Sequence, residues 1–378
     1  MNEKPTVLIL TAKYGSGHMQ AAQVLANELN KRGYSIIISD LFEESYPSFS
    51  QMTQQLLIKS YIYGQTFYKW FYYGTNKLNH KGLIQFSQYL GKKRLLHLIQ
   101  QYKPSFIVTT FPIHVAPALV KKGRLSIPVY TVITDYCVHP YWINSLIDHY
   151  FVASDEVKNA VMQLGVDEKR ITVSGIPIRR DFEKDVNHLT LYQKYNLDES
   201  KPIITIFAGA YGVLKGVKEL ATGLLEMENI QIIIICGKNK DLYTKLFSLT
   251  KNDQNTLRLY SYVEKIHELF SISSCLITKP GGITLTEACA LHIPMILYRP
   301  IPGQELENAH YFKKHQAAYI TYSSTETIKI TKQIIETPSI ATNMKLNLRN
   351  LYYPNASTII IDHILHQSLK PMMSKGGN

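Results

Sequence analysis

His18 is the first side chain of the sequence that could do chemistry, and it ends the run Tyr14-Gly15-Ser16-Gly17-His18. The run follows a strand-like segment, residues 6–10, and precedes a helical pattern. Glycines there let another molecule approach the helix start, where free N–H groups favour negative charge. Imidazole titrates near neutral pH, so His18 is a candidate general base. The alternative is a histidine that only hydrogen-bonds at the helix start.

The same loop can be compared with a dinucleotide-binding fingerprint, G-x-G-x-x-G, in which Asp40 would hold a ribose. Gln20 occupies the place of the third glycine. A histidine in the turn would also crowd a pyrophosphate. The sequence therefore disfavours a dinucleotide site.

Asp135 is the second catalytic candidate, in the loop VITDYCVHPYW at residues 132–142. It follows a strand-like run, so we expect its carboxylate at the carboxyl end of a sheet, where ligands bind. His139 and Trp142 come later in this loop. The alternative is an Asx turn that ends the strand. Whether His18 or Asp135 is the base stays open.

Three loops in the second half of the chain resemble anion and sugar sites. In residues 207–220, glycines surround Lys215 before a helical pattern. In residues 278–296, Lys279-Pro280-Gly281-Gly282 precedes a helix that carries Glu287, which could bind sugar hydroxyls or be a solvated surface residue. In residues 300–309, amide and carboxylate side chains cluster at Gln304, Glu305 and Asn308.

Short β-branched runs that alternate with helical patterns must position these loops. This alternation is typical of parallel sheets covered on both faces. It restarts near Lys201, after a polar stretch, so we expect two doubly wound α/β domains. We place an N-terminal domain at residues 1–190, a C-terminal domain at 191–352, and a helix at 353–378 that crosses back. The strand-like segments start at residues 6, 34, 105, 127, 149, 170, 201, 230, 257, 274 and 293.

Composition limits the class of protein. The 378 residues are 45% hydrophobic, enough for packed cores, and no window of 18 apolar residues would span a bilayer. The four cysteines form no CxxC pair, which disfavours structural zinc. The net charge of +12 favours an acidic partner, but no basic block or nucleic-acid-binding motif is present. We therefore expect no nucleic acid partner.

Six motifs occur in order over nearly the whole chain: YGSGHMQAA, TDYCVHPYW, VSGIPI, AGAYGVLKG, KPGGITLTEA and PGQELENA. Together they resemble the diacylglycerol glycosyltransferases of family 28. The resemblance implies a GT-B fold, with two Rossmann-like domains facing a central cleft. It implies a UDP-sugar donor in the second domain and a lipid acceptor at the first. The expected reaction transfers glucose from UDP-glucose to the 3-hydroxyl of 1,2-diacylglycerol, giving a β-glucoside, with further glucose transfers possible.

The resemblance also implies roles for single residues. His18 and Asp135 match the catalytic positions, and Glu287 matches the glutamate that holds the uridine ribose. Gln304 and Glu305 match residues beside the donor hexose. The remaining donor-binding residues are Gly17, Gly209, Val213, Lys279, Gly281 and Gly282. No D-x-D occurs, so we expect no metal and no cofactor beyond the UDP-sugar.

Other functions remain open at this point. UDP-galactose could be the donor, as in monogalactosyldiacylglycerol synthesis, or a polyprenyl-linked lipid could be the acceptor of N-acetylglucosamine. A nucleotide-binding regulatory protein and a sugar-nucleotide epimerase are rivals from other classes. Intact His18, Asp135, Glu287 and Gln304 count against a regulatory protein.

An aromatic stretch at residues 56–75 holds eight Tyr, Phe and Trp residues with lysines between them. Such residues suit the bilayer interface, and Lys92, Lys93 and Arg94 follow. We expect Tyr68, Trp70, Phe71 and Tyr72 to attach the first domain peripherally to anionic lipids of the cytoplasmic membrane face. A buried core segment is the alternative.

Overall fold

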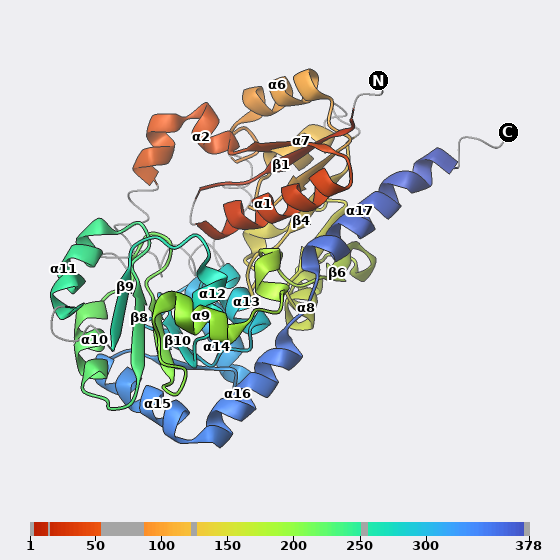
Figure 1. Ribbon diagram of the computed structural model, residues 1–378. Coiled ribbons are helices and arrows are strands. Elements are labelled where there is room, and N and C mark those ends of the chain that lie inside the picture. The colour runs from red at the N-terminus through yellow and green to blue at the C-terminus, as the bar shows by residue number, and fades with distance from the viewer. Residues whose placement is uncertain (1–3, 14–15, 54–86, 122–126, 251–255, 374–378) are drawn as a thin grey trace. The chain divides into compact units, whose positions relative to one another are not determined.

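The computed structural model describes residues 4–13, 16–53, 87–121, 127–250 and 256–373. They form two compact units (Figure 1). Of the described residues, the first unit contains those up to Arg179 and those from Tyr353 onward, and the second contains Arg180–Tyr352. This division falls eleven residues before the expected end of the first domain at residue 190.

A parallel sheet of six strands, in the order β2-β1-β3-β4-β5-β6, forms the centre of the first unit. Its strands are short and rich in β-branched and aromatic residues, and most of their side chains are buried, as expected for a sheet covered on both faces. They are β1 (Thr6–Leu10), β2 (Ser35–Ser39), β3 (Phe106–Thr109), β4 (Val129–Val132), β5 (His149–Val152) and β6 (Ile171–Val173).

Two helices from opposite ends of the chain share one core in the first unit. Helix α1 (Ser16–Lys31) packs beside α17 (Ala356–Met373), and buried isoleucines of α17 join the cluster that contains Leu25 (Figure 1). The tail from residue 353 therefore completes the first unit. The other helical segments are α2 (Leu41–Ser45), α6 (Lys92–Tyr102), α7 (Val115–Lys121), η1 (Pro140–Trp142), α8 (Asp155–Gln163) and η2 (Glu168–Arg170).

The second unit has its own parallel sheet of six strands, in the order β12-β11-β10-β7-β8-β9. Its strands are β7 (Ile203–Phe207), β8 (Gln231–Ile235), β9 (Leu257–Tyr260), β10 (Cys275–Thr278), β11 (Met295–Tyr298) and β12 (Ala318–Thr321). Its helical segments are η3 (Arg180–Glu183), α9 (His188–Tyr195), α10 (Val217–Leu225), α11 (Lys240–Thr250), α12 (Ile266–Ser271), α13 (Gly282–Ala290), α14 (Gln304–Lys314), α15 (Ser324–Glu336) and α16 (Pro338–Leu351).

All eleven strand-like segments of the sequence are strands in the structure, but β12 was not predicted. This edge strand has only four residues, and two of them are half-buried. A short run of this kind lacks the continuous apolar pattern of the central strands, and its pairing with β11 defines it as a strand.

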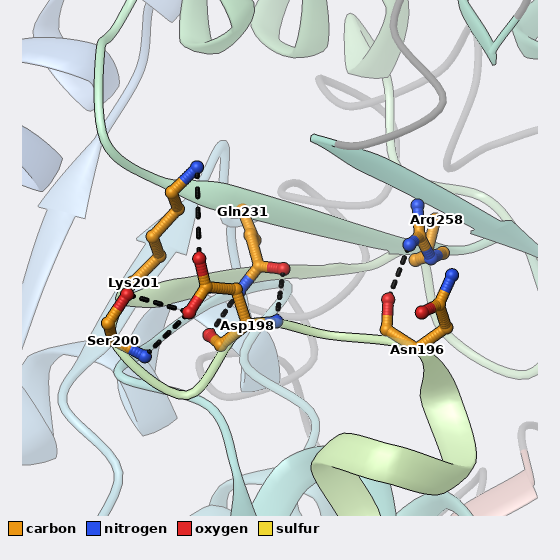
Figure 2. A network of polar contacts seen from close by, with 6 residues as sticks. All are labelled: Asn196, Asp198, Ser200, Lys201, Gln231 and Arg258. Carbon is orange, nitrogen blue, oxygen red and sulfur yellow. Dashed lines mark hydrogen bonds and ion pairs between the residues drawn. The ribbon is translucent and has the colours of Figure 1, made fainter.

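A polar network fixes the segment that leads into β7 (Figure 2). Gln231, at the start of β8, is buried, and its amide accepts from the Asp198 N–H (2.8 Å) and donates to the Asp198 carbonyl (2.7 Å). The Asp198 carboxylate accepts from the hydroxyl and the N–H of Ser200, which lowers its pKa. Arg258 donates to the carbonyl of Asn196. The two strands β8 and β9 therefore hold the chain where the second unit's sheet begins.

Replacing Gln231 with Leu should destabilise the second unit, because it leaves the N–H and carbonyl of Asp198 without these partners. We expect a loss of about 1–3 kcal/mol in the free energy of unfolding, measured by urea denaturation. The same change at exposed Gln333 is the control and should cost less than about 0.5 kcal/mol. Equal midpoints for the two variants would show that the Gln231 bonds do not stabilise this segment.

Candidate active site

The strand order of the first unit creates one point where ligands can bind. The chain adds β2 on one side of β1 and then crosses to place β3 on the other side. At such a switch point the loops after the two strands turn away in opposite directions and leave a crevice. His18 is the third residue of α1, which follows β1, and Thr110 directly follows β3. The histidine of the glycine loop therefore lies at the switch point.

Two loops hold the His18 side chain. Its Nδ1 lies 2.8 Å from the carbonyl oxygen of Thr110 and 2.9 Å from the hydroxyl of Thr134, which comes after β4. A carbonyl oxygen can only accept a hydrogen bond, so Nδ1 carries the proton in the neutral ring. The lone pair is then on Nε2, the nitrogen that could take a proton.

The charge state of His18 is balanced by opposing effects. Removal from water disfavours the imidazolium and lowers the His18 pKa below its usual 6.5. The nearby charge of Asp135 and the bond to Thr110 oppose this shift but do not cancel it. His18 is therefore neutral at pH 7, while the buried Asp135 can stabilise an imidazolium that forms during a reaction.

Aromatic rings complete the surroundings of His18. Phe111 and Trp142 lie 5.2 Å and 6.1 Å away, measured between ring centroids. Trp142 is buried in η1, and His139 caps this short helix by accepting from the N–H of Tyr141 (3.1 Å). His139 therefore has a local structural role, and Trp142 forms part of the His18 environment.

Asp40, the ribose ligand of the dinucleotide alternative, has a different role. One carboxylate oxygen caps α2 by accepting from the N–H groups of Phe42 and Glu43 (3.1 and 3.0 Å). The other accepts from the N–H of Lys13 at 2.8 Å. Both oxygens of this buried carboxylate are committed to the backbone, so the structure gives no support to a ribose site here.

The second unit has an equivalent switch point between β7 and β10. The loops that follow these strands are the glycine loop at Gly209 and the loop at Lys279. Gly209 has a φ of +83°, and a Cβ there would lie 3.3 Å from Cε of Lys279. Glycine is therefore needed both for the backbone conformation and for the lysine side chain that lies against it.

Helix α13 begins at this switch point. Gly281 is its N-cap residue and has no side-chain cap, so the first N–H groups can meet an anion. Glu287, the sixth residue of α13, is 3% exposed. The alternative of a solvated surface glutamate is wrong, because α13 is buried on nearly every face. Carboxylates are rarely buried unless they have a partner, so the buried Glu287 beside the switch point stays a candidate for binding a ligand.

Helix α14 brings the third loop of the second unit to the same place. Glu305, its second residue, is buried and forms an ion pair with Lys279, with 2.8 Å between Oε1 and Nζ. Asn308 is fully buried and donates to the carbonyl oxygen of Pro280 at 3.2 Å. The loops after β7, β10 and β11 therefore meet around Lys279.

The structure brings most predicted residues together within their own units. His18 and Asp135 gather in the first unit, and Gly17 lies there too, in the first turn of α1. Gly209, Lys279 and Glu305 gather in the second. The other predicted residues of the second unit, which lie on the same loops and helices, are Val213, Gly281, Gly282, Glu287 and Gln304. Tyr68, Trp70, Phe71 and Tyr72 lie outside the described residues.

Thr110 and Thr134, the two residues that position His18, were not predicted from the sequence. Thr110 is the first residue after β3 and Thr134 the second after β4. A polar side chain just after a β-branched run was therefore the signal that could have identified them. Among the residues that the structure describes, no group of three or more His, Cys, Asp and Glu side chains could hold a metal ion.

Comparisons with known proteins show the family and the fold of the chain. Residues 18–178 match the model of the monogalactosyldiacylglycerol (MGDG) synthase family, and residues 204–348 match the glycosyltransferase family 28 C-terminal domain. MurG from Acinetobacter baumannii superposes with a TM-score of 0.63 at 17% identity, over 96% of this chain and 99% of that one. The S. aureus MnaA–UDP co-structure superposes with a TM-score of 0.63 at 13% identity, over 96% of both chains. The expected GT-B fold is confirmed.

A curated relative is similar over almost the full length. The chain is 44% identical over 369 residues to the processive diacylglycerol beta-glucosyltransferase of Bacillus cereus strain B4264, which covers 97% of this chain and 95% of the relative. By this identity and by the two family models that it matches, the chain belongs to the family 28 glycosyltransferases, in the group of the processive diacylglycerol β-glucosyltransferases.

Proposed function

We propose that the protein transfers glucose from UDP-glucose to the 3-hydroxyl of 1,2-diacylglycerol with inversion, and that it can extend the product by a second glucose. The observation that carries this proposal is the 44% identity over 97% of the chain to relatives of that name. A glucolipid of this kind would serve as a membrane component or as an anchor for lipoteichoic acid. The choice of glucose over galactose rests on the names of these relatives.

The second unit would hold the donor. The α13 N-terminus and Lys279 supply positive charge for a diphosphate at the β7–β10 switch point. Glu287 would accept hydrogen bonds from the ribose hydroxyls. Gln304 and Glu305, at the start of α14, would contact the hexose.

The first unit would bind and activate the acceptor. Nε2 of neutral His18 would take the proton of the acceptor hydroxyl, and Asp135 would stabilise the imidazolium that results. The hydroxyl oxygen forms its bond to the anomeric carbon as the bond from that carbon to UDP breaks. The electron pair of the broken bond remains on the β-phosphate, where Lys279 and the α13 N–H groups would stabilise it. We propose that no metal ion takes part.

We also propose that the first unit binds the cytoplasmic membrane face peripherally through aromatic and basic residues. No described helix is long and apolar enough to cross a bilayer. Residues on both sides of the stretch at 56–75 support this proposal. Before it, Tyr46, Phe49 and Met52 are 43–50% exposed, and after it Tyr89 is 57% exposed beneath the ammonium group of Lys92.

These exposed groups come from two segments that contact each other. Helix α2 packs against α6, and Arg94 of α6 pairs with Glu44 of α2 at 2.6 Å. Aromatic rings suit the bilayer interface, and each nearby lysine adds about 1 kcal/mol of attraction to anionic lipid. Diacylglycerol stays in the bilayer, so an enzyme that acts on it needs a surface of this kind.

The donor site can be tested at Glu287. Glu287→Ala should weaken UDP binding, because charge-assisted hydrogen bonds to the ribose would be lost, at a cost of about 1.5–3 kcal/mol. Calorimetry with UDP measures this, and Glu287→Gln should lose less because it keeps the shape and one acceptor oxygen. Unchanged UDP affinity in the alanine variant would remove Glu287 from the site.

The base can be tested by turnover on diacylglycerol vesicles. His18→Ala should lower turnover about 10²–10⁴-fold while UDP binding survives. In the wild-type protein kcat/KM should fall at low pH as His18 becomes protonated. Because burial lowers the His18 pKa, the midpoint of this fall should lie below pH 6.5. Near-normal turnover in both His18→Ala and Asp135→Ala would mean that neither residue is the base.

The membrane surface can be tested by co-sedimentation with phosphatidylglycerol vesicles. Changing Trp70, Phe71 and Tyr72 together to Ser should release the protein while UDP binding remains. A matched control changes Phe247, Tyr322 and Leu346, which are 48–56% exposed on the second unit, to Ser. High salt should weaken binding only in part, since the aromatic contribution is not screened. A first triple variant that pellets like wild type would place the membrane contact elsewhere.

A further inference from the structure

The ion pair between Lys279 and Glu305 lies at the β7–β10 switch point, where the donor diphosphate is proposed to bind. Lys279 directly follows β10, and its side chain crosses Gly209 of the loop after β7 to reach Glu305 on α14. Nζ and Oε1 are 2.8 Å apart. The lysine at the switch point is therefore already neutralised by a carboxylate of the same unit.

Loss of the Lys279 partner would be unfavourable for Glu305. Its side chain is only 9% exposed, and its other oxygen accepts a long 3.4 Å bond from the N–H of Ile301. Lys279 is 26% exposed and can turn toward a ligand more easily. If a phosphate draws Lys279 away, Glu305 keeps one weak bond in a largely desolvated place, which is unfavourable for a carboxylate.

UDP and a UDP-hexose would differ in the hydrogen-bond donors that they offer to Glu305 once Lys279 has moved away. UDP supplies phosphate oxygens, which attract Lys279 but cannot donate to a carboxylate. A UDP-hexose brings the same diphosphate together with sugar hydroxyls, and a hydroxyl can donate to Glu305 in place of the lysine. Only the intact donor would therefore give a new partner both to Lys279, through its phosphates, and to Glu305, through a sugar hydroxyl.

We propose that Glu305 is a specificity residue that favours the intact sugar nucleotide over spent UDP, because it competes with the diphosphate for Lys279. The proposal rests on the proposed function, since it takes the donor to be a UDP-hexose. The ion pair then also acts after the transfer. Once the hexose has left, the ion pair between Glu305 and Lys279 re-forms and the affinity for UDP falls.

The ratio of the dissociation constants of UDP and UDP-glucose tests this proposal. In Glu305→Gln the lysine has no competing charge, so UDP should bind about threefold to fivefold more tightly, the size of a partly exposed charge interaction. UDP-glucose should bind equally or more weakly, and UDP should become a stronger product inhibitor. Uridine, which has no phosphate, should bind both proteins equally.

Two further variants test whether the tighter binding of UDP comes from competition for Lys279. Glu336→Gln removes the acid of an exposed Lys–Glu pair and should leave both affinities unchanged. In a Lys279→Gln background, Glu305→Gln should no longer tighten UDP. If it still does, Glu305 repels the phosphates directly and the proposed competition is wrong.

Weaker binding of UDP by Glu305→Gln would also overturn the proposal, because the pair would then be part of the bound state. Thermal unfolding of the variant checks that such a loss is not due to misfolding. The proposed function fails separately, if the wild-type protein binds neither UDP nor UDP-glucose.

Discussion

Each unit depends on a crossover that places a later strand of its sheet beside the first strand, on the side opposite the second. In the first unit β3 pairs with β1, and in the second β10 pairs with β7. The loops after these strands then meet at the carboxyl edge, although His18 and Thr110 are 92 positions apart in the sequence and Gly209 and Lys279 are 70 apart. The buried, β-branched strands fix the position of this edge. Short polar loops can therefore hold charged groups in place without further supporting structure.

The same architecture holds different chemical groups at the switch points of the two units. In the first unit the switch point holds a neutral imidazole whose tautomer is set by a backbone carbonyl, with a carboxylate nearby. In the second it holds a lysine, an uncapped helix start and buried carboxylates. A proton acceptor suits a hydroxyl substrate, and fixed positive charge suits a diphosphate leaving group. These contrasting loops support the proposal that the first unit activates the acceptor and the second unit binds the donor.

Much of this could be predicted from the sequence. The apolar runs predicted eleven of the twelve strands found in the described residues, and the polar residues that follow them marked His18, Asp135 and Lys279 as candidates. Contacts between distant side chains could not be predicted. The bonds of His18 to Thr110 and Thr134, the capping role of Asp40 and the pair of Lys279 with Glu305 depend on strand order and loop path. Local periodicity carries no information on either, and the four-residue edge strand β12 was missed for the same reason.

In the proposed reaction this protein transfers the hexose of a UDP-hexose to a lipid hydroxyl and releases UDP. The most direct measurement incubates it with diacylglycerol vesicles and radiolabelled UDP-glucose or UDP-galactose, and separates the lipid products. We expect labelled β-glucosyl-diacylglycerol, followed by a diglucosyl product, and little label from UDP-galactose. Label that enters lipid only from UDP-galactose, or appears only as free sugar in the water phase, would contradict the proposed function.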